Sequence, residues 1–564
     1  MVMKKIGLVL FQLTSCMPVW YNGWKNPEES GNMQPVLFTN GNLFLPHSAS
    51  TADSIYVEDG IIRAIGSAAD LRLQLADRRY RTVDWDGAFV LPGLVDAHLH
   101  LGMHGLKLGM LDFTEATSKE EMLDMLRERV AVTQPGEWIM GLNWNEHNFR
   151  DHQIPSMQEL DDVTTEHPVY LTRTCFHAYL GNSEAFRRAG VTSDTPDPES
   201  GAFGRDADGR LNGRIYENAS IPFAMVQPEP DPASLKLAML EACRDALRLG
   251  LTAAHTEDLR LLGSVEAMQR IHRELREEGL HFRTHQLMFH GYLDEMKELG
   301  LKPGSGNDWN RIGAVKLFAD GAVGGRTALL KEPYHDAPHT RGLAMHTFEE
   351  LREIVGRARH LGFPVAFHAI GDGAAALMTD VLEFYPLSRD AKLPDRFIHA
   401  QIVHPDTVKR MSKLNLAVDL QPRFVASDFP WVLERVGPDR TSYLYAWKKW
   451  LRSGLPCSGG SDAPIEPLSP LLGIHAAMTR RKPEERHDGY LPEEKLSLTE
   501  AIELFTLGGA KAEGESGQRG TITIGKYADF TVVDRCLHDA MDPDEMLKTK
   551  IRMTIVNGEI GYTQ

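Results

Sequence analysis

Cysteine is scarce in this sequence of 564 residues: there are five, and no two of them form a Cys-x-x-Cys pair. This number and spacing indicate neither a disulfide framework nor a zinc ribbon. The sequence also lacks any run of about 20 apolar residues, the length that a transmembrane helix needs. We therefore expect a protein without a transmembrane segment in a reducing compartment, the cytoplasm.

Basic residues are fewer than acidic ones. The sequence has 61 Lys and Arg against 78 Asp and Glu, which gives a formal net charge of −17. Nucleic acids and anionic membranes repel an acidic surface, so neither is an expected partner. A hydrophobic share of 42% is ordinary for a globular protein. We expect a small-molecule ligand, and the composition allows a homodimer.

Residues 1–33 have two interpretations. Two lysines precede a short apolar run, and Leu13-Thr-Ser-Cys16 resembles the lipobox at which bacterial lipoprotein signals are cut. The protein would then be exported and anchored by lipid. The apolar run is short and no Ser/Gly-rich spacer follows it, so we favour an N-terminal extension before a functional chain that begins near Met33.

Both ends of the remaining chain consist of short β-rich runs around turns. Asn40-Gly41 and Asp59-Gly60 between such runs in residues 34–90 are typical of hairpins. Residues 516–564 repeat the pattern, and neither end has enough strands for a stable sheet. We predict that the two ends pair into one small β-sandwich.

Between these ends, eight short apolar runs alternate with helical patterns such as residues 348–359. The runs are residues 91–100, 252–256, 282–286, 313–318, 365–368, 397–399, 416–421 and 457–462. Eight strands alternating with helices predict an α/β fold, a (β/α)₈ TIM barrel. Strand 1 falls in residues 91–112 and the rest of the barrel in residues 241–515.

Residues 113–240 do not fit the strand count and are expected to form an insertion subdomain after strand 1. Two strand-like runs, at residues 138–142 and 168–172, lie inside it. An insertion of this length in a compact domain is usually functional. We expect it to wall or cover the substrate pocket.

The first barrel strand ends in His98-Leu-His100. Residues i and i+2 of a strand project from the same face, so two imidazoles point one way, as a zinc site would need. Such a pair alone is a weak signal. Later strands also end in polar residues of ligand type, namely Lys316, His368, His399 and Asp462. Because barrel active sites lie at the carboxyl ends of the strands, we expect these side chains to converge.

Six motifs resemble those of a known family. They are Leu91-Pro-Gly-Leu-Val-Asp-Ala-His-Leu-His100, Val315-Lys-Leu-Phe-Ala-Asp-Gly321, His368-Ala-Ile-Gly-Asp372, His399-Ala-Gln401, Gly460-Ser-Asp-Ala-Pro-Ile-Glu466 and Gly525-Lys-Tyr-Ala-Asp529. The chain resembles the amidohydrolase superfamily, and within it the YtcJ-like amidohydrolases, a branch that also contains N-substituted formamide deformylase and the regulatory protein AepA. The resemblance implies a metal-dependent hydrolase, usually a zinc enzyme, that acts on a C–N bond other than a peptide bond.

The resemblance also implies roles for individual residues. His98 and His100 match ligands of the more buried metal ion. His368 and His399 match ligands of a second ion or, in a site with one ion, residues that bind it and steady the attacking water. Lys316 matches the lysine at the end of strand 4 that CO₂ converts to a carbamate, which bridges two ions. Alternatively, Lys316 is a plain lysine that pairs with Asp320 or binds a substrate anion.

Asp462 is the expected general base, because a carboxylate at the end of strand 8 can take a proton from the attacking water and pass it to the leaving nitrogen. Four further residues are candidates for substrate binding: Arg326 in a glycine-rich loop, and Trp144, His177 and Glu217 in the insertion. Glu217 matches an acidic residue of the family's insertion and is alternatively a metal ligand. His255 and His285, at the ends of strands 2 and 3, are expected to be structural or to support the ligands rather than to bind metal.

These observations favour a metal-dependent amidohydrolase that hydrolyses an amide or formamide-type bond through metal-activated water. It would hold one or two divalent ions, two if Lys316 is carboxylated. A deaminase of the same superfamily with a single ion is one alternative. A metal-binding regulatory protein without catalytic activity is another.

Overall fold

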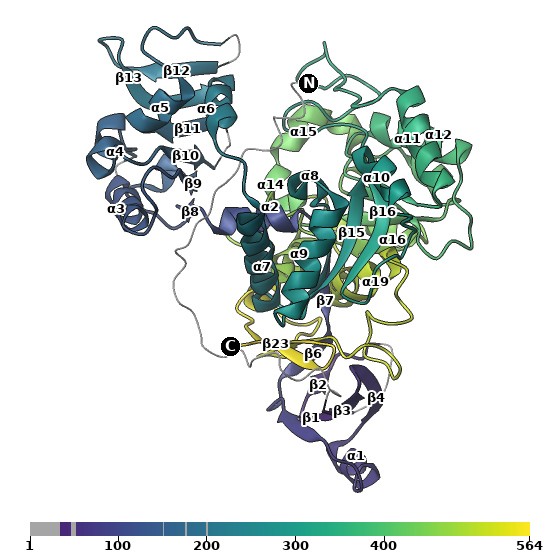
Figure 1. Cartoon of the computed structure of the whole chain (residues 1–564). Helices are drawn as coiled ribbons and strands as arrows, with labels where there is room; N and C mark the ends of the chain where they lie inside the picture. The colour runs from purple at the N-terminus through teal and green to yellow at the C-terminus, as the bar shows by residue number, and fades with distance from the viewer. Residues whose placement is uncertain (1–33, 47–51, 151, 175–176, 199–200) are drawn as a thin grey trace. The chain divides into compact units, whose positions relative to one another are not determined.

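The computed structural model describes residues 34–46, 52–150, 152–174, 177–198 and 201–564 (Figure 1). The N-terminal segment with the lipobox-like Cys16 lies outside these residues. The described chain divides into two compact units, one of residues 102–242 and a larger one of residues 34–101 and 243–564. The smaller unit therefore begins at Gly102 rather than at residue 113. Every described helix is too short or too polar to cross a lipid bilayer.

One parallel sheet of eight strands forms the centre of the larger unit, which confirms the predicted barrel arrangement. Its strands are β7 (Leu94–Leu99), β14 (Leu251–Thr256), β15 (Arg283–Phe289), β16 (Asn310–Phe318), β17 (Val365–Ala369), β18 (Asp395–His399), β19 (Leu416–Leu420) and β20 (Cys457–Gly459). Each strand pairs in parallel with the next one along the chain. The carboxyl ends of all eight strands therefore lie at one face.

The two edge strands of this sheet, β7 and β20, meet just beyond their carboxyl ends. The Asp462 N–H donates to the His98 carbonyl at 2.8 Å, and the His100 N–H donates to the Ala463 carbonyl at 2.8 Å. A Cβ atom at Gly460 would lie only 2.6 Å from the His98 backbone nitrogen, so this approach requires glycine. The same hydrogen bonds that join the edges also bring the candidate site residues together.

Helices connect the barrel strands, and α11 (Phe348–His360) shows how such a helix buries one apolar face. In this helix, Thr347 and Glu350 form a capping box, and Leu351, Val355 and Ala358 are buried at helical spacing. The other helices of the larger unit are α1 (Ala68–Gln74), α8 (Leu259–Leu262), α9 (Val265–Glu277), α10 (Leu293–Glu298), α12 (Asp372–Phe384), α13 (Pro405–Met411), α14 (Phe424–Asp428), α15 (Trp431–Val436), α16 (Trp447–Arg452), α17 (Pro470–Thr479), α18 (Leu498–Glu503), α19 (Gly509–Ala512) and α20 (Pro543–Met546).

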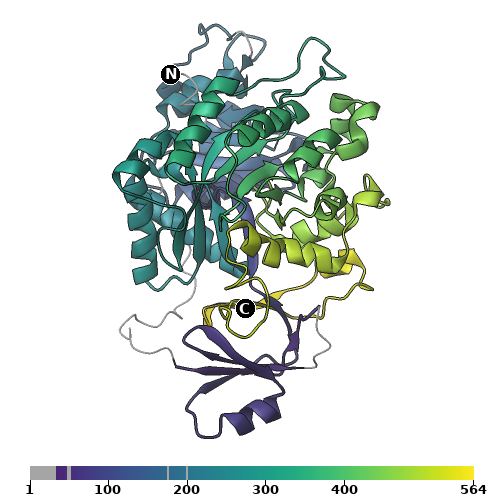
Figure 2. The ribbon, with the colours of Figure 1, turned by 90° about the vertical axis from the view of Figure 1, so that its right-hand side faces the viewer.

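Strands from both chain ends form two further sheets in the larger unit, seen below the barrel in Figure 2. One contains β4 (Ile61–Gly66), β3 (Ser54–Glu58), β1 (Val36–Thr39) and β5 (Arg81–Asp84), and the other β2 (Asn42–Leu43), β6 (Phe89–Pro92), β21 (Phe530–Val533), β22 (Ile551–Val556) and β23 (Glu559–Thr563). They share one core, in which Phe38 stacks on Trp85 with ring centres 5.0 Å apart and both contact Phe530.

Two details of this region differ from the sequence prediction. The run at residues 91–100 is not one strand, because β6 ends at Pro92 in the second of these sheets and β7 begins at Leu94 in the barrel. Asp59-Gly60 does form a hairpin turn, with positive φ at both residues. The prediction of a hairpin at Asn40-Gly41 is wrong, since this turn joins β1 and β2, which belong to different sheets.

The smaller unit is built on a six-stranded sheet. Its strands, in sheet order, are β12 (Gly201–Arg205), β13 (Leu211–Glu217), β11 (Ala178–Gly181), β10 (Val169–Arg173), β9 (Ile139–Trp144) and β8 (Leu111–Asp112). Its helices are α2 (Leu101–Leu108), α3 (Lys119–Val130), α4 (Met157–Val163), α5 (Ser183–Ala189), α6 (Ile221–Val226) and most of α7 (Pro232–Arg248). Phe113, Leu126, Trp144 and Leu171 are among the residues of its own core.

Candidate metal centre

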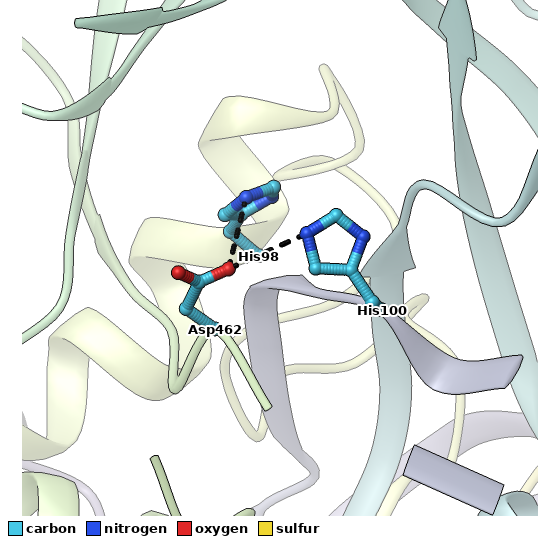
Figure 3. A group of neighbouring side chains, drawn as sticks. All are labelled: His98, His100 and Asp462. Carbon is cyan, nitrogen blue, oxygen red and sulfur yellow. Dashed lines mark ion pairs between the residues drawn. The ribbon is translucent and has the colours of Figure 1, made fainter. Parts of the chain in front are cut away.

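Three side chains point at one another where the barrel edges meet (Figure 3). Oδ1 of Asp462 lies 3.4 Å from Nε2 of His98 and 3.5 Å from Nε2 of His100. The side chains are only 1%, 11% and 12% exposed for His98, Asp462 and His100. Among the described residues, this is the only group of three or more His, Cys, Asp or Glu whose donor atoms all lie within 4.8 Å of one another.

The geometry and chemistry of this group fit a divalent transition metal. Donors at about 2.1 Å from a tetrahedral ion lie roughly 3.4 Å apart, close to the two separations seen here. Imidazole binds a metal in its neutral form, and burial lowers the pKa of His98 well below its ordinary value and that of His100 to about 4. The Glu257 carbonyl accepts a hydrogen bond from Nδ1 of His100 at 2.9 Å, which leaves Nε2 free as a ligand.

His399 and His368 extend this group along the carboxyl ends of β18 and β17. The centre of the His399 ring lies 5.7 Å from the centre of the His98 ring and 4.4 Å from that of the His368 ring. Gln421 positions His399, because its Oε1 lies 3.0 Å from Nδ1 of that histidine and can accept a hydrogen bond from the Nδ1–H. The structure thus places all four histidines close together at the carboxyl ends of the barrel strands.

Asp320 lies behind His368. Its Oδ1 is 3.3 Å from Nδ1 of His368, and its two oxygens accept hydrogen bonds from the backbone N–H groups of Leu329, Ile370 and Gly371. These bonds fix the carboxylate beside the ring and connect the loop after β16 to the end of β17. Asp320 is therefore placed to orient His368 and is not a partner of Lys316.

Lys316 is completely buried beside the metal group. Its Nζ lies 3.2 Å from Nε2 of His98. Burial is the main cause that lowers the pKa of this amine to about 7, although Asp462 opposes the shift. A substantial fraction of the lysine is therefore neutral near pH 7, the form in which an amine can react with CO₂.

The backbone is strained at the two residues predicted to be catalytic. Asp462 has φ of 60° and His399 has φ of 81°, in the left-handed region that residues other than glycine rarely adopt. Burial raises the pKa of Asp462 to about 7, while the charge of Lys316 opposes this shift. A carboxylate with a pKa near neutrality can both accept and return a proton at that pH.

Sequence reasoning missed the residues that hold these ligands in place. Glu257 follows β14 directly, Gln421 follows β19 directly, and both are polar residues at strand ends. Asp96, within β7, accepts hydrogen bonds from the Ser461 N–H at 3.0 and 3.1 Å and so fixes the loop before Asp462. The sequence shows that these polar residues lie within or directly after barrel strands. It does not show which ring or loop each of them contacts.

The four candidates for substrate binding lie in local pairs or in a core. Arg326 pairs with Asp336 at 2.8 Å. In the smaller unit, Nδ1 of His177 lies 2.9 Å from Glu217, and both side chains are more than half exposed. Trp144 is buried, and its indole N–H donates to the Leu171 carbonyl at 3.0 Å. A contribution of these residues to substrate binding stays a prediction.

His255 and His285 lie on neighbouring strands and are buried in a separate cluster. Nε2 of His255 is 3.2 Å and Nδ1 of His285 is 3.8 Å from Oε2 of Glu513, which also pairs with Arg519. Neither histidine belongs to the group of converging metal donors. A structural or supporting role for both histidines stays a prediction.

Comparison with known proteins shows the family of this chain. The sequence model of the Amidohydrolase family matches residues 81–562. The chain belongs to the amidohydrolase family. It is 38% identical to amidohydrolase YtcJ of Bacillus subtilis over 90% of this chain and 96% of that protein. It is 25% identical to N-substituted formamide deformylase of Arthrobacter pascens over 94% of this chain and 98% of the deformylase.

Among solved structures, an uncharacterized metal-dependent hydrolase from Pyrococcus horikoshii is similar to this member of the amidohydrolase family. The TM-score is 0.73 and the identity 27%, over 91% of this chain and 99% of the other. The likeness covers nearly the whole of both chains, so it includes the barrel and not only the six motifs.

Proposed function

We propose that this protein is a metal-dependent amidohydrolase that hydrolyses an amide or formamide-type C–N bond of a small molecule. The buried group of His98, His100 and Asp462 carries the proposal, because its donor spacing and neutral imidazoles suit a divalent ion such as zinc. The metal-dependent hydrolase from Pyrococcus and the deformylase from Arthrobacter support it as relatives of this chain.

A divalent ion at this group would lower the pKa of a water molecule toward roughly 7 and polarise the substrate carbonyl. A side chain of the protein then transfers the protons. Asp462 accepts a proton from the attacking water as the new C–O bond forms, and it returns the proton to the nitrogen as the C–N bond breaks. Gln421 holds the His399 ring through Nδ1, which leaves Nε2 as the nitrogen that could bind an ion.

We also propose that Lys316 is carboxylated. Its neutral amine attacks CO₂, a C–N bond forms, and one proton is released to give an anionic carbamate. The anion would replace a cation that sits 3.2 Å from a metal-binding imidazole, and it would add oxygen donors for a second ion beside His368 and His399. The low pKa of Lys316, about 7, supports this reaction.

A second candidate is a deaminase with one metal ion and an unmodified Lys316. One observation favours it: His98, His100 and Asp462 form a complete donor group without any contribution from the lysine. Metal stoichiometry distinguishes the two candidates, since the deaminase would hold one ion.

In this proposal the barrel holds the reacting groups, and the two other parts of the chain have supporting roles. The single core shared by strands from both chain ends supports a β-sandwich. The separate core of residues 102–242 supports an inserted subdomain that folds as its own unit. We propose that this subdomain influences which substrates reach the barrel.

A panel of N-formyl, N-acyl, cyclic amide and aminopurine compounds tests the function on protein loaded with zinc, manganese or iron. Release of an amine and a carboxylate from amides supports the proposal, whereas release of ammonia from aminopurines alone supports the deaminase. Lys316→Arg should abolish turnover and its dependence on bicarbonate, while Lys413→Arg on the exposed surface should change neither. Hydrolysis of no compound with any metal would favour a regulatory protein without catalytic activity.

A further inference from the structure

We propose that Arg260 forms a subsite for a carboxylate of the substrate, so that the preferred substrates are amides with a carboxylate a few bonds from the scissile carbonyl. This inference rests on the proposed hydrolase function and specifies its substrate class. Arg260 lies in α8, which follows β14, the strand that pairs with β7 and its metal-binding histidines.

Two aromatic rings hold the Arg260 guanidinium at the carboxyl face of the barrel. Its central carbon lies 4.6 Å from the ring centre of Phe318 and 5.4 Å from that of Phe289, the last residues of β16 and β15. Stacking of this kind orients the guanidinium plane and leaves its N–H edge available to a planar anion.

The same rings place Arg260 close to the metal centre. The Nζ of Lys316 lies 4.9 Å from the Phe318 ring centre, and the His368 ring centre lies 5.4 Å from it. Arg260 and Lys316 thus both lie within 5 Å of the centre of one phenylalanine ring. A substrate with its scissile carbonyl at the metal centre would reach Arg260 through only a short spacer.

Glu257 connects Arg260 to a metal-binding histidine. Its carboxylate accepts hydrogen bonds from Nε of Arg260 at 2.7 Å and pairs with Nη2 at 2.6 Å, while its backbone carbonyl holds His100. Glu257 is buried, but the Arg260 side chain is 36% exposed. In the described part of the chain, the bonds to Arg260 leave its Nη1 for a ligand.

The comparison of paired ligands tests this subsite directly. N-acyl amino acids and their carboxamides differ in one charged group, and calorimetry on zinc-loaded protein measures their binding without any turnover. Because a charge-assisted pair contributes a factor of roughly 10 to 100, the carboxylate should bind that much more tightly than the carboxamide. Arg260→Met should remove this preference, and Arg260→Lys should restore part of it.

Arg352 offers a matched control. Its guanidinium stacks on Phe384 at 4.0 Å in the same way, but on the helices α11 and α12. Arg352→Met should leave the preference for carboxylates unchanged.

Kinetics of hydrolysis of the same N-acyl amino acids and carboxamides give a second measurement. Arg260→Met should raise KM for the carboxylates and leave KM for the carboxamides unchanged.

Four results would overturn the inference: equal binding of carboxylates and carboxamides, a preference that survives Arg260→Met, equal loss of both series in that variant, or binding of neither series. The proposed hydrolase fails in a different way. If carboxylates bind through Arg260 but no compound is hydrolysed, the subsite stands and the hydrolase function does not. If amides are hydrolysed without any preference, the hydrolase stands and the subsite does not.

Discussion

His98 and His100 lie beside Asp462, whereas His255 and His285, on the next two strands of the same barrel, lie beside Glu513. Both groups combine two buried imidazoles with one buried carboxylate. The second group also contains Arg519, which pairs with Glu513 and supplies the positive charge that a metal ion would bring. The cation that acts most strongly on Asp462 is Lys316, whose pKa burial lowers to about 7.

Position along the strand separates His285 from the first group, but not His255. His285 is the third residue of β15, and that strand continues to Phe289. His255 is the fifth of the six residues of β14, as His98 is the fifth of the six residues of β7. The comparison therefore teaches that charge balance, rather than residue type or strand position alone, distinguishes the two groups of histidines.

Asp462→Asn should have the largest effect. The amide cannot accept a proton from water, so kcat should fall by about 10³-fold, within the usual contribution of a general base. Steady-state kinetics on the hydrolysed substrate measure this, with circular dichroism as the control for folding. Retention of more than a tenth of the activity would mean that another group is the base.

Glu513→Gln should affect stability and leave the metal in place. The substitution leaves the buried Arg519 without its anionic partner, which costs about 3 kcal/mol in the free energy of unfolding. Denaturant unfolding measures the loss, and elemental analysis measures the metal. If this variant folded normally but lost its metal, the second cluster would be a metal site and the comparison above would break down.

The second cluster should also make the metal-free protein sensitive to acid. Burial holds the pKa of His255 and His285 well below the ordinary value. Below about pH 6.5 the unfolded chain binds protons that the folded chain does not, so the free energy of unfolding falls by about 1.4 kcal/mol per pH unit for each histidine. Above that pH the contribution is fully present.

Denaturant unfolding of metal-free protein between pH 7.5 and 5 checks this slope, because in roughly this window His255 and His285 titrate in the unfolded chain but not in the folded one. The His255→Gln/His285→Gln variant should show a shallower decline than the parent protein. The exposed His360→Gln should show the same decline as the parent. An unchanged slope in the double variant would mean that the two buried histidines do not contribute.

Much of this architecture was predictable from the sequence. Alternation of apolar runs with helical patterns placed all eight barrel strands, and ligand-type residues at strand ends made His98, His100, His368, His399 and Asp462 candidates for the site. Such patterns are local, and a barrel converts local strand ends into one rim. The full length of β15 was missed, because its continuation through Leu287 and Met288 has no polar alternation to mark it.

The partners of the ligands were not predictable. Gln421 holds His399, Glu257 holds His100 and Asp320 lies beside His368, and each of these contacts joins different strands. A sequence shows that a polar residue ends a strand, but not which neighbouring ring it meets. For the same reason the alternative pairing of Lys316 with Asp320 was consistent with the sequence and is absent from the structure.

Metal content is the most direct test of the central claim. Protein purified without chelator should contain about two ions per chain, as a two-metal site with a carboxylated Lys316 requires. His98→Ala/His100→Ala should lose most of this metal, and His255→Gln/His285→Gln should retain it. Less than one ion per chain in the parent protein, or equal losses in both double variants, would contradict the account.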